Sequence, residues 1–109
     1  MNSRALSSAV VAALLLAASP ALANEQTAIN MVRHEPGVLD AVPDHAGNLW
    51  VSVLPNNSMN WSVYAKALCQ VVVPQQARIF LIKVVDATTV AKSKNPHDWR
   101  LLGGANCAN

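Results

Sequence analysis

Two different hydrophobic patterns meet in residues 61–86, WSVYAKALCQVVVPQQARIFLIKVVD. In the first half, apolar residues recur at spacings of four, three and four, which places them on one face of a helix. They are Trp61, Ala65, Leu68 and Val72. Pro74 prevents the helix from continuing far, and residues 78–86 are apolar at both alternating sets of positions. This stretch therefore predicts a helix, a break and a central strand that is covered on both faces.

A shorter helix and two strands are predicted before this stretch. Apolar residues recur at helical spacing in residues 25–35, and Pro36 and Gly37 end that helix. Residues 38–42 and 49–54 are rich in branched side chains, and the residues between them, PDHAGN, have turn chemistry. The pattern predicts two antiparallel strands joined by a loop.

The predicted elements follow the order helix, strand, strand, helix, strand, with a less regular tail. Asn57 or Ser58 is placed to cap the second helix, and the tail contains a short apolar segment, residues 99–102. Residues 24–109 are expected to form one small domain. Helices interleaved with hairpin-forming strands predict an α+β fold, a two-layer sandwich of order α-β-β-α-β with both helices on one face of the sheet.

The order of these elements is similar to that of a known family of periplasmic domains. The tripeptide PGV at residues 36–38, and LWVSV at residues 49–53 after Val42, resemble BON-type domains and, more distantly, ferredoxin-like heavy-metal-associated domains. The resemblance covers residues 25–86 and implies a comparable fold. The first strand and the Cys-x-x-Cys loop of the metal-associated family are absent, so copper or zinc handling does not carry over. VLP at residues 53–55 replaces the glycine-containing strand of BON domains, which counts against their phospholipid association.

Residues 1–23 have the features of a removable export signal. Arg4 supplies a positive charge, residues 9–18 are continuously apolar, and ALA at residues 21–23 fits the small-x-small cleavage pattern. The apolar run is shorter than the roughly 20 residues needed to span a bilayer. Cleavage after the triplet would leave residues 24–109, so the sequence predicts a protein exported to the bacterial periplasm or secreted.

Charge and composition exclude several classes of partner. The chain has eight basic and six acidic residues, a formal net charge of +2, and removal of Arg4 with the signal would lower that charge further. Neither a nucleic-acid surface nor a polybasic membrane patch is indicated. A nucleic-acid partner is therefore not expected, and membrane association is not indicated by charge.

Cys69 and Cys107 are the only cysteines of the chain. An even cysteine count in a small exported protein predicts a disulfide. By loop entropy, a bridge between these positions would stabilise the fold by about 4 kcal/mol, a large contribution where the core is small. The wide spacing differs from the Cys-x-x-Cys pattern of redox and zinc sites, so we predict a structural bridge.

No catalytic, cofactor or metal site is predicted. His34, His45 and His97 each neighbour a carboxylate in sequence, but their spacing does not bring together the three or four ligands of a metal site. No serine has the glycine pattern of a nucleophile elbow, and no glycine loop has the sequence that holds phosphate. A small hydrolase would require His45 or His97 to converge with a serine and an acid.

The outer face of the predicted sheet is the strongest candidate for a partner surface. If alternate residues of 49–53 face the helices, Trp50 and Leu54 face the other way. Either the C-terminal segment with Trp99 folds back as a cover or a fourth strand, or Trp50, Leu54 and Trp99 form a partner or self-association face. We therefore predict a non-enzymatic binding module of the accessory, inhibitor or immunity type. A BON-like envelope module that associates with membrane or lipid is the alternative, and a small periplasmic hydrolase is the third class.

Overall fold

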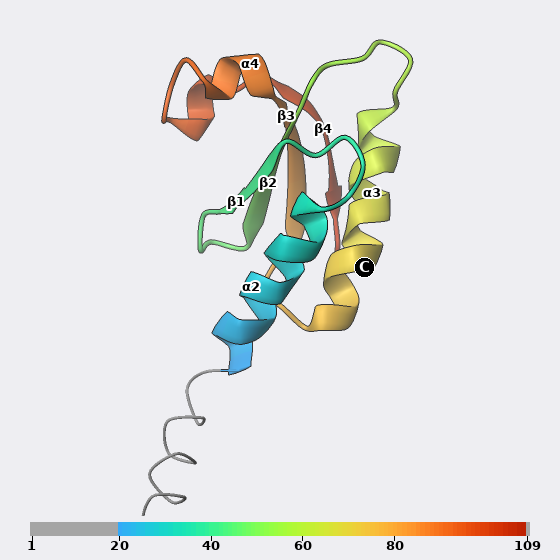
Figure 1. Ribbon diagram of the computed structural model, residues 1–109, viewed down its shortest axis with the longest axis vertical. Helices are drawn as coiled ribbons and strands as arrows, with labels where there is room; N and C mark the ends of the chain where they lie inside the picture. The colour runs from blue at the N-terminus through green and yellow to red at the C-terminus, as the bar shows by residue number, and fades with distance from the viewer. Residues whose placement is uncertain (1–19, 109) are drawn as a thin grey trace, which may run out of the picture.

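The protein has an α+β fold, seen in a computed structural model that describes residues 20–108 (Figure 1). Its elements are α2 (Pro20–Arg33), β1 (Asp40–Pro43), β2 (Asn48–Val53), α3 (Trp61–Val72), η1 (Val73–Gln75), β3 (Leu81–Asp86), α4 (Ala87–Val90), η2 (Pro96–Asp98) and β4 (Leu101–Asn106). The predicted order α-β-β-α-β is confirmed. The predicted export signal, residues 1–23, lies outside the described residues except for its last four, which begin α2 earlier than the predicted residue 25.

Four strands form one mixed sheet in the order β1-β2-β3-β4. β1 and β2 are antiparallel, as predicted, and so are β3 and β4. β2 and β3 are parallel, which requires a crossover connection, and α3 supplies it. β3 therefore lies inside the sheet, in agreement with its apolar residues at both alternating positions, while β1 and β4 are the edges.

α2 and α3 pack on one face of the sheet and close a two-layer core (Figure 1). The buried residues of the inner strands on this face include Leu49, Val51, Ile82 and Val84. The buried residues of the helices include Ala28, Ile29, Val32, Ala65, Leu68 and Val72. The apolar stripe predicted for the second helix therefore faces the core, and Trp61 is half-buried at its start.

Several element boundaries differ from the sequence prediction by a few residues, among them the start of the second helix and the start of the central strand. α3 is capped by Asn60, not by Asn57 or Ser58. Oδ1 of Asn60 accepts hydrogen bonds from two backbone N–H groups of the first turn, both at 3.1 Å. Several residues that favour caps precede this helix, and the path of the chain selects one of them. The central strand begins at Leu81 rather than at residue 78.

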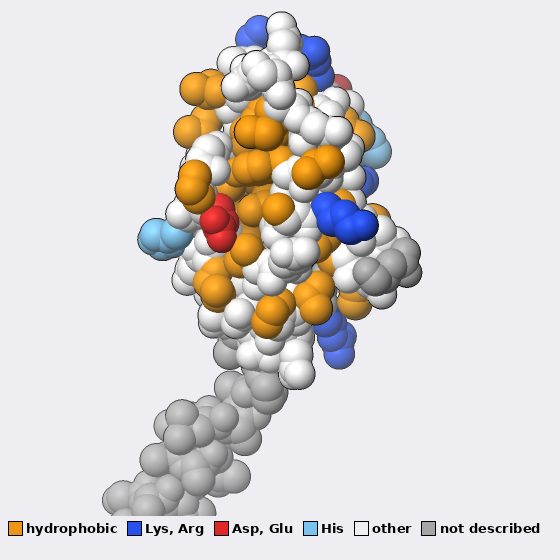
Figure 2. Space-filling model, turned by 90° about the vertical axis from the view of Figure 1, so that its right-hand side faces the viewer, with side chains coloured by type: hydrophobic (Ala, Val, Ile, Leu, Met, Phe, Trp, Pro, Cys, Tyr) orange, Lys and Arg blue, Asp and Glu red, His pale blue; other side chains and the backbone are white. Residues whose placement is uncertain are grey.

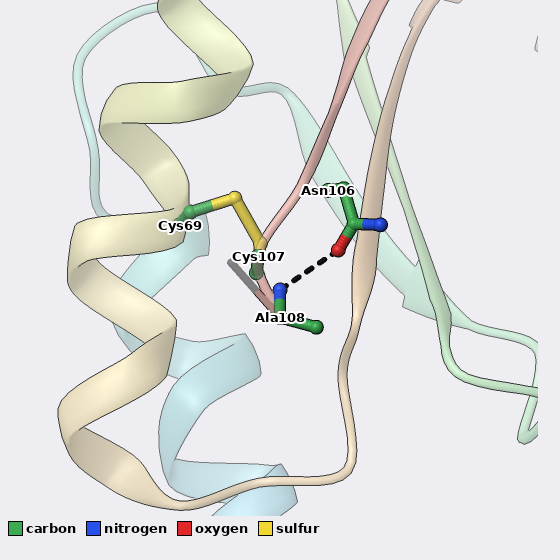
Figure 3. The surroundings of a disulfide bond; sticks show 4 residues. All are labelled: Cys69, Asn106, Cys107 and Ala108. Atoms are coloured by element: carbon green, nitrogen blue, oxygen red, sulfur yellow. Dashed lines mark hydrogen bonds between the residues drawn. A yellow bond between two sulfur atoms is a disulfide. The ribbon is translucent and has the colours of Figure 1, made fainter.

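A disulfide joins the end of the sheet to the second helix (Figure 3). Cys69 in α3 and Cys107, directly after β4, are bonded as predicted, and both are buried. Next to the bridge, the side chain of Asn106 accepts a hydrogen bond from the N–H of Ala108 at 2.8 Å. Structural disulfides are typical of oxidising compartments. Within residues 20–108, no helix combines the length and apolar character needed to cross a membrane.

Candidate functional site

The outer face of the sheet, opposite the two helices, carries the candidate site. The strand register aligns one row of residues across all four strands: Val42, Trp50, Lys83 and Gly104. Successive side chains of a strand point to opposite faces. Because its neighbours Leu49 and Val51 are in the core, Trp50 faces away from the helices, as the sequence predicted.

The connection from β3 to β4 covers one end of this face. α4 contacts both β2 and β3, and the outward-facing Ser52 and Val85 are only 7% and 1% exposed. Asp86 begins the connection by capping α4, since its carboxylate accepts hydrogen bonds from the N–H and the hydroxyl of Thr88 at 2.9 and 2.8 Å. The C-terminal segment therefore supplies both a partial cover and a fourth strand.

Trp50 lies next to the covered end of the outer face. Its ring meets Trp99 edge-on, with ring centroids 5.5 Å apart and an interplanar angle of 84°. The Lys83 ammonium is 4.7 Å from the centroid of the Trp50 ring, a cation–π geometry. The indole N–H donates to Oδ2 of Asp44 at 3.2 Å. These contacts hold the indole in one orientation while it stays half-exposed.

Asp44 orders the turn between β1 and β2. Its carboxylate accepts hydrogen bonds from the Ala46 N–H at 2.8 Å, and from the N–H and side-chain amide of Asn48 at 3.2 and 2.8 Å. Desolvation raises the pKa of this carboxyl group, but the hydrogen bonds from Ala46, Asn48 and Trp50 outweigh it and hold the pKa of Asp44 below its ordinary value. The charged form of Asp44 is therefore the form that orders the turn and fixes Trp50.

We expect Asp44→Asn to lower the free energy of unfolding by about 1 kcal/mol at neutral pH, because the turn loses hydrogen bonds to a charged acceptor. A carboxyl group with a lowered pKa in the folded state stabilises the fold above its unfolded-state pKa. That contribution is lost as the pH falls through the folded-state pKa. Urea denaturation at about pH 7 and about pH 2 should therefore show a difference from wild type that shrinks in acid. Asp98→Asn, at an exposed carboxylate, is the control, and equal pH responses of the two variants would contradict the assignment.

The structure brings together two of the three residues predicted for a partner surface. Trp50 and Trp99 are in ring contact, whereas Leu54 lies just beyond β2 and is 62% exposed. The sequence analysis missed Lys83 and Asp44. Lys83 is the one charged residue in the apolar run of residues 79–85, and Asp44 opens a turn rich in Asn and Gly, so both had a local signal.

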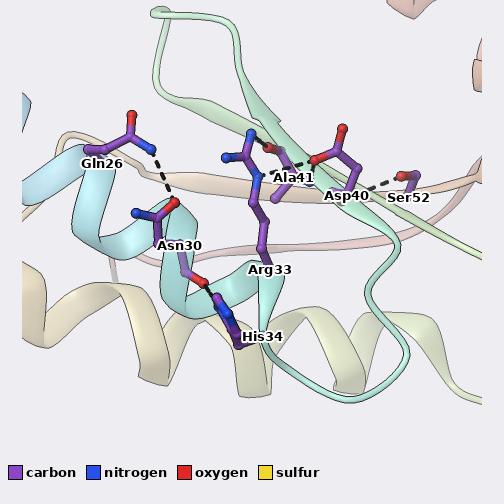
Figure 4. A network of polar contacts seen from close by, with 7 residues as sticks. All are labelled: Gln26, Asn30, Arg33, His34, Asp40, Ala41 and Ser52. Atoms are coloured by element: carbon purple, nitrogen blue, oxygen red, sulfur yellow. Dashed lines mark hydrogen bonds and ion pairs between the residues drawn. The ribbon is translucent and has the colours of Figure 1, made fainter.

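The three histidines lie at separate positions on the surface. His34 Nδ1 is 2.6 Å from the carbonyl oxygen of Asn30 (Figure 4), and His45 Nδ1 is 3.6 Å from Oε1 of Glu25. His97 is exposed in η2. In the part of the chain that the structure describes, no three His, Cys, Asp or Glu side chains gather as a metal ion would require.

Comparisons of the chain with protein-family models, curated proteins and solved structures found no match. The fold and the site themselves define a small α+β domain closed by one disulfide. Its distinguishing surface is a half-covered sheet face on which Trp50 is held by Trp99, Lys83 and Asp44.

Proposed function

We propose that the protein is an exported, non-enzymatic binding module that recognises another protein through the open part of its outer sheet face. The observation that carries the proposal is an apolar group spread over three adjacent strands around Trp50. Val42 on β1 is 43% exposed, and Leu81 on β3 is 38% exposed. Aromatic anchors within apolar surroundings supply most of the binding energy in protein interfaces.

The fixed orientation of Trp50 favours binding. Ordering a side chain at an interface costs free energy, and here Trp99 and Asp44 already hold the indole before any partner arrives. Lys83 places a positive charge at the centre of the face, and its flexible side chain can turn from the ring to a carboxylate. The partner surface that fits is apolar and carries an acidic group. By recognising such a surface, this protein would act as an accessory, inhibitor or immunity-type protein.

Export is supported by two features. The disulfide is typical of oxidising compartments, and residues 1–23 have the pattern of an export signal. Cleavage after residue 23 would fall within α2; from residue 24 onward, where burial is described, the buried residues of this helix are Ala28, Ile29 and Val32. The cleaved domain would therefore keep the core contacts described for α2, in the bacterial periplasm or outside the cell.

We expect Trp50→Ala to abolish capture of the partner when the immobilised protein is exposed to a periplasmic extract and bound proteins are identified by mass spectrometry. Lys83→Glu should weaken capture by about tenfold, because it replaces attraction to the acidic group of the partner by repulsion. Leu39→Ala, at an exposed leucine before β1, is the control and should retain the partner. Capture unchanged in both variants would refute the proposal, and near-UV circular dichroism checks that Trp50→Ala stays folded.

Two other classes are tested with the same preparation. If the protein floated with phospholipid vesicles, and Trp50→Ala did not affect this flotation, the BON-like, lipid-associated module would be favoured instead.

A hydrolase would need a serine, an acid and a histidine to converge. The Ser93 hydroxyl donates to Asp98 at 2.8 Å, but the nearby His97 enters this turn through its backbone N–H, which donates to the Asn95 side chain at 3.0 Å.

A further inference from the structure

The β1 edge of the sheet is closed to further strands. Ala41 donates its N–H to the side chain of Asp40 at 2.8 Å. The carbonyl oxygen of Ala41 accepts a hydrogen bond from Nη2 of Arg33 at 2.9 Å (Figure 4). Pro43 has no N–H to offer. The outward N–H groups of Ala41 and Pro43 are thus satisfied or missing, and the Ala41 carbonyl is occupied, which is one way in which proteins protect an edge strand.

The β4 edge is open. Cys107 donates its N–H to the carbonyl oxygen of Phe80 on the β3 side at 2.7 Å. Because bonding residues alternate along an antiparallel ladder, the backbone N–H and C=O groups of Gly104 and Asn106 point away from β3. Both residues are exposed, and no strand of the described chain lies beyond β4. The strand sequence, LLGGAN, also lacks the charges and prolines that usually protect an edge.

A groove runs between this edge and α3. Two adjoining hollows of about 440 and 480 Å³ follow the seam, and Lys66 of α3 lines both of them. Val63 and Val73 contribute exposed apolar side chains, 64% and 52% accessible. Figure 2 faces this side of the molecule and shows hydrophobic side chains gathered on it, with basic side chains on one side of them and an acidic side chain on the other. The open backbone edge therefore has a side-chain pocket next to it.

We propose that β4 binds an extended segment of another polypeptide as a fifth strand, with alternate side chains of that segment placed in the groove beside α3. In this mode of recognition, main-chain hydrogen bonds supply affinity and the pockets supply specificity. A six-residue strand such as β4 offers about 20 Å of edge. The site lies on a different surface from the Trp50 face and does not depend on it.

Charge identifies the kind of segment. Among the described residues, Lys66 is the one charged residue that lines these two hollows, and it is basic. A segment with a carboxylate placed toward Lys66 therefore fits. A second copy fits less well, because β4 has no acidic residue and an edge-to-edge pair of β4 strands would bring two positively charged helices together without a counter-charge.

The test compares two end-capped synthetic peptides, TVTETVTVT and TVTKTVTVT, in which the charged residue shares one face with the valines, for binding to the intact protein by fluorescence anisotropy. We expect the acidic peptide to bind about tenfold more tightly, since the basic peptide replaces attraction to Lys66 by repulsion. Amide NMR shifts should concentrate at Gly104 and Asn106. Lys66→Glu should reverse the preference, whereas Lys94→Glu, the same charge change in an exposed loop, should leave it unchanged.

Three further outcomes would overturn this assignment. If both peptides bound equally well and Lys66→Glu changed neither affinity, the groove beside β4 would not be the binding site. The same conclusion would follow if the amide shifts lay away from β4. If sedimentation showed a dimer and dimer formation blocked peptide binding, the occupant of the β4 edge would be a second copy of the chain. Asn106→Pro removes one outward N–H and should weaken both peptides, with urea denaturation as the check on folding. Trp50→Ala should leave peptide binding intact, so failure here is distinct from failure of the proposed function.

Discussion

Replacing Cys69 and Cys107 together by alanine is expected to lower the free energy of unfolding by about 4 kcal/mol. The bridge connects positions 38 residues apart in sequence, and without it the unfolded chain gains conformations that the bridge excludes. Domains of this size have a total stability of about 5–15 kcal/mol. The loss is therefore a large share of what keeps the domain folded.

Guanidinium denaturation of the double variant and of the oxidised wild type measures the effect. Reductant should destabilise the wild type and leave the double variant unchanged, which separates loss of the bridge from other effects of the reductant. A difference below about 1 kcal/mol between variant and wild type would show that β4 is held to α3 by packing alone. The reduced wild type should also bind the acidic peptide less well, because the bridge fixes the distance between the walls of the groove.

The predictable part of this fold is the part whose patterns are local in sequence. The stripe that contains Ala65 and Leu68 repeats at helical spacing, so the residues alone identify the buried face of α3. The central strand is evident because apolar residues occupy both of its faces. The bridge between Cys69 and Cys107 follows from the presence of only two cysteines. The first two inferences need no knowledge of distant neighbours, and the third is a long-range contact for which the chain offers each cysteine only one partner.

The features that the sequence does not reveal depend on contacts between distant segments. Asn60 caps α3 although other cap-forming residues precede it, and only the entry of the chain into the helix distinguishes them. The pairing of Trp50 with Trp99 requires the connection between β3 and β4 to fold over the sheet. The open edge at Gly104 becomes visible only when strand order and register are known. These are the features on which both proposed binding surfaces rest.

A close contact between β4 and α3 explains why glycine occurs inside a strand. A Cβ atom on Gly103 would lie 2.6 Å from the backbone nitrogen of Ser62 and 2.7 Å from the carbonyl carbon of Trp61. Both atoms belong to the backbone of the first turn of α3, where Asn60 holds the helix end. They cannot turn aside as a flexible side chain would, so glycine at position 103 is required by the close approach of helix and strand.

Gly103→Ala is therefore expected to lower the free energy of unfolding by about 3 kcal/mol, because α3 or β4 must shift to admit one methyl group. Urea denaturation measures the loss, and Leu101→Ala, at an exposed position of the same strand, should stay within about 0.5 kcal/mol of wild type. The displacement should also change the groove and weaken binding of the acidic peptide. If Gly103→Ala were as stable as wild type, α3 would be free to move away from β4. A preformed groove between them could not then exist, and the proposed strand-binding site would lose its structural basis.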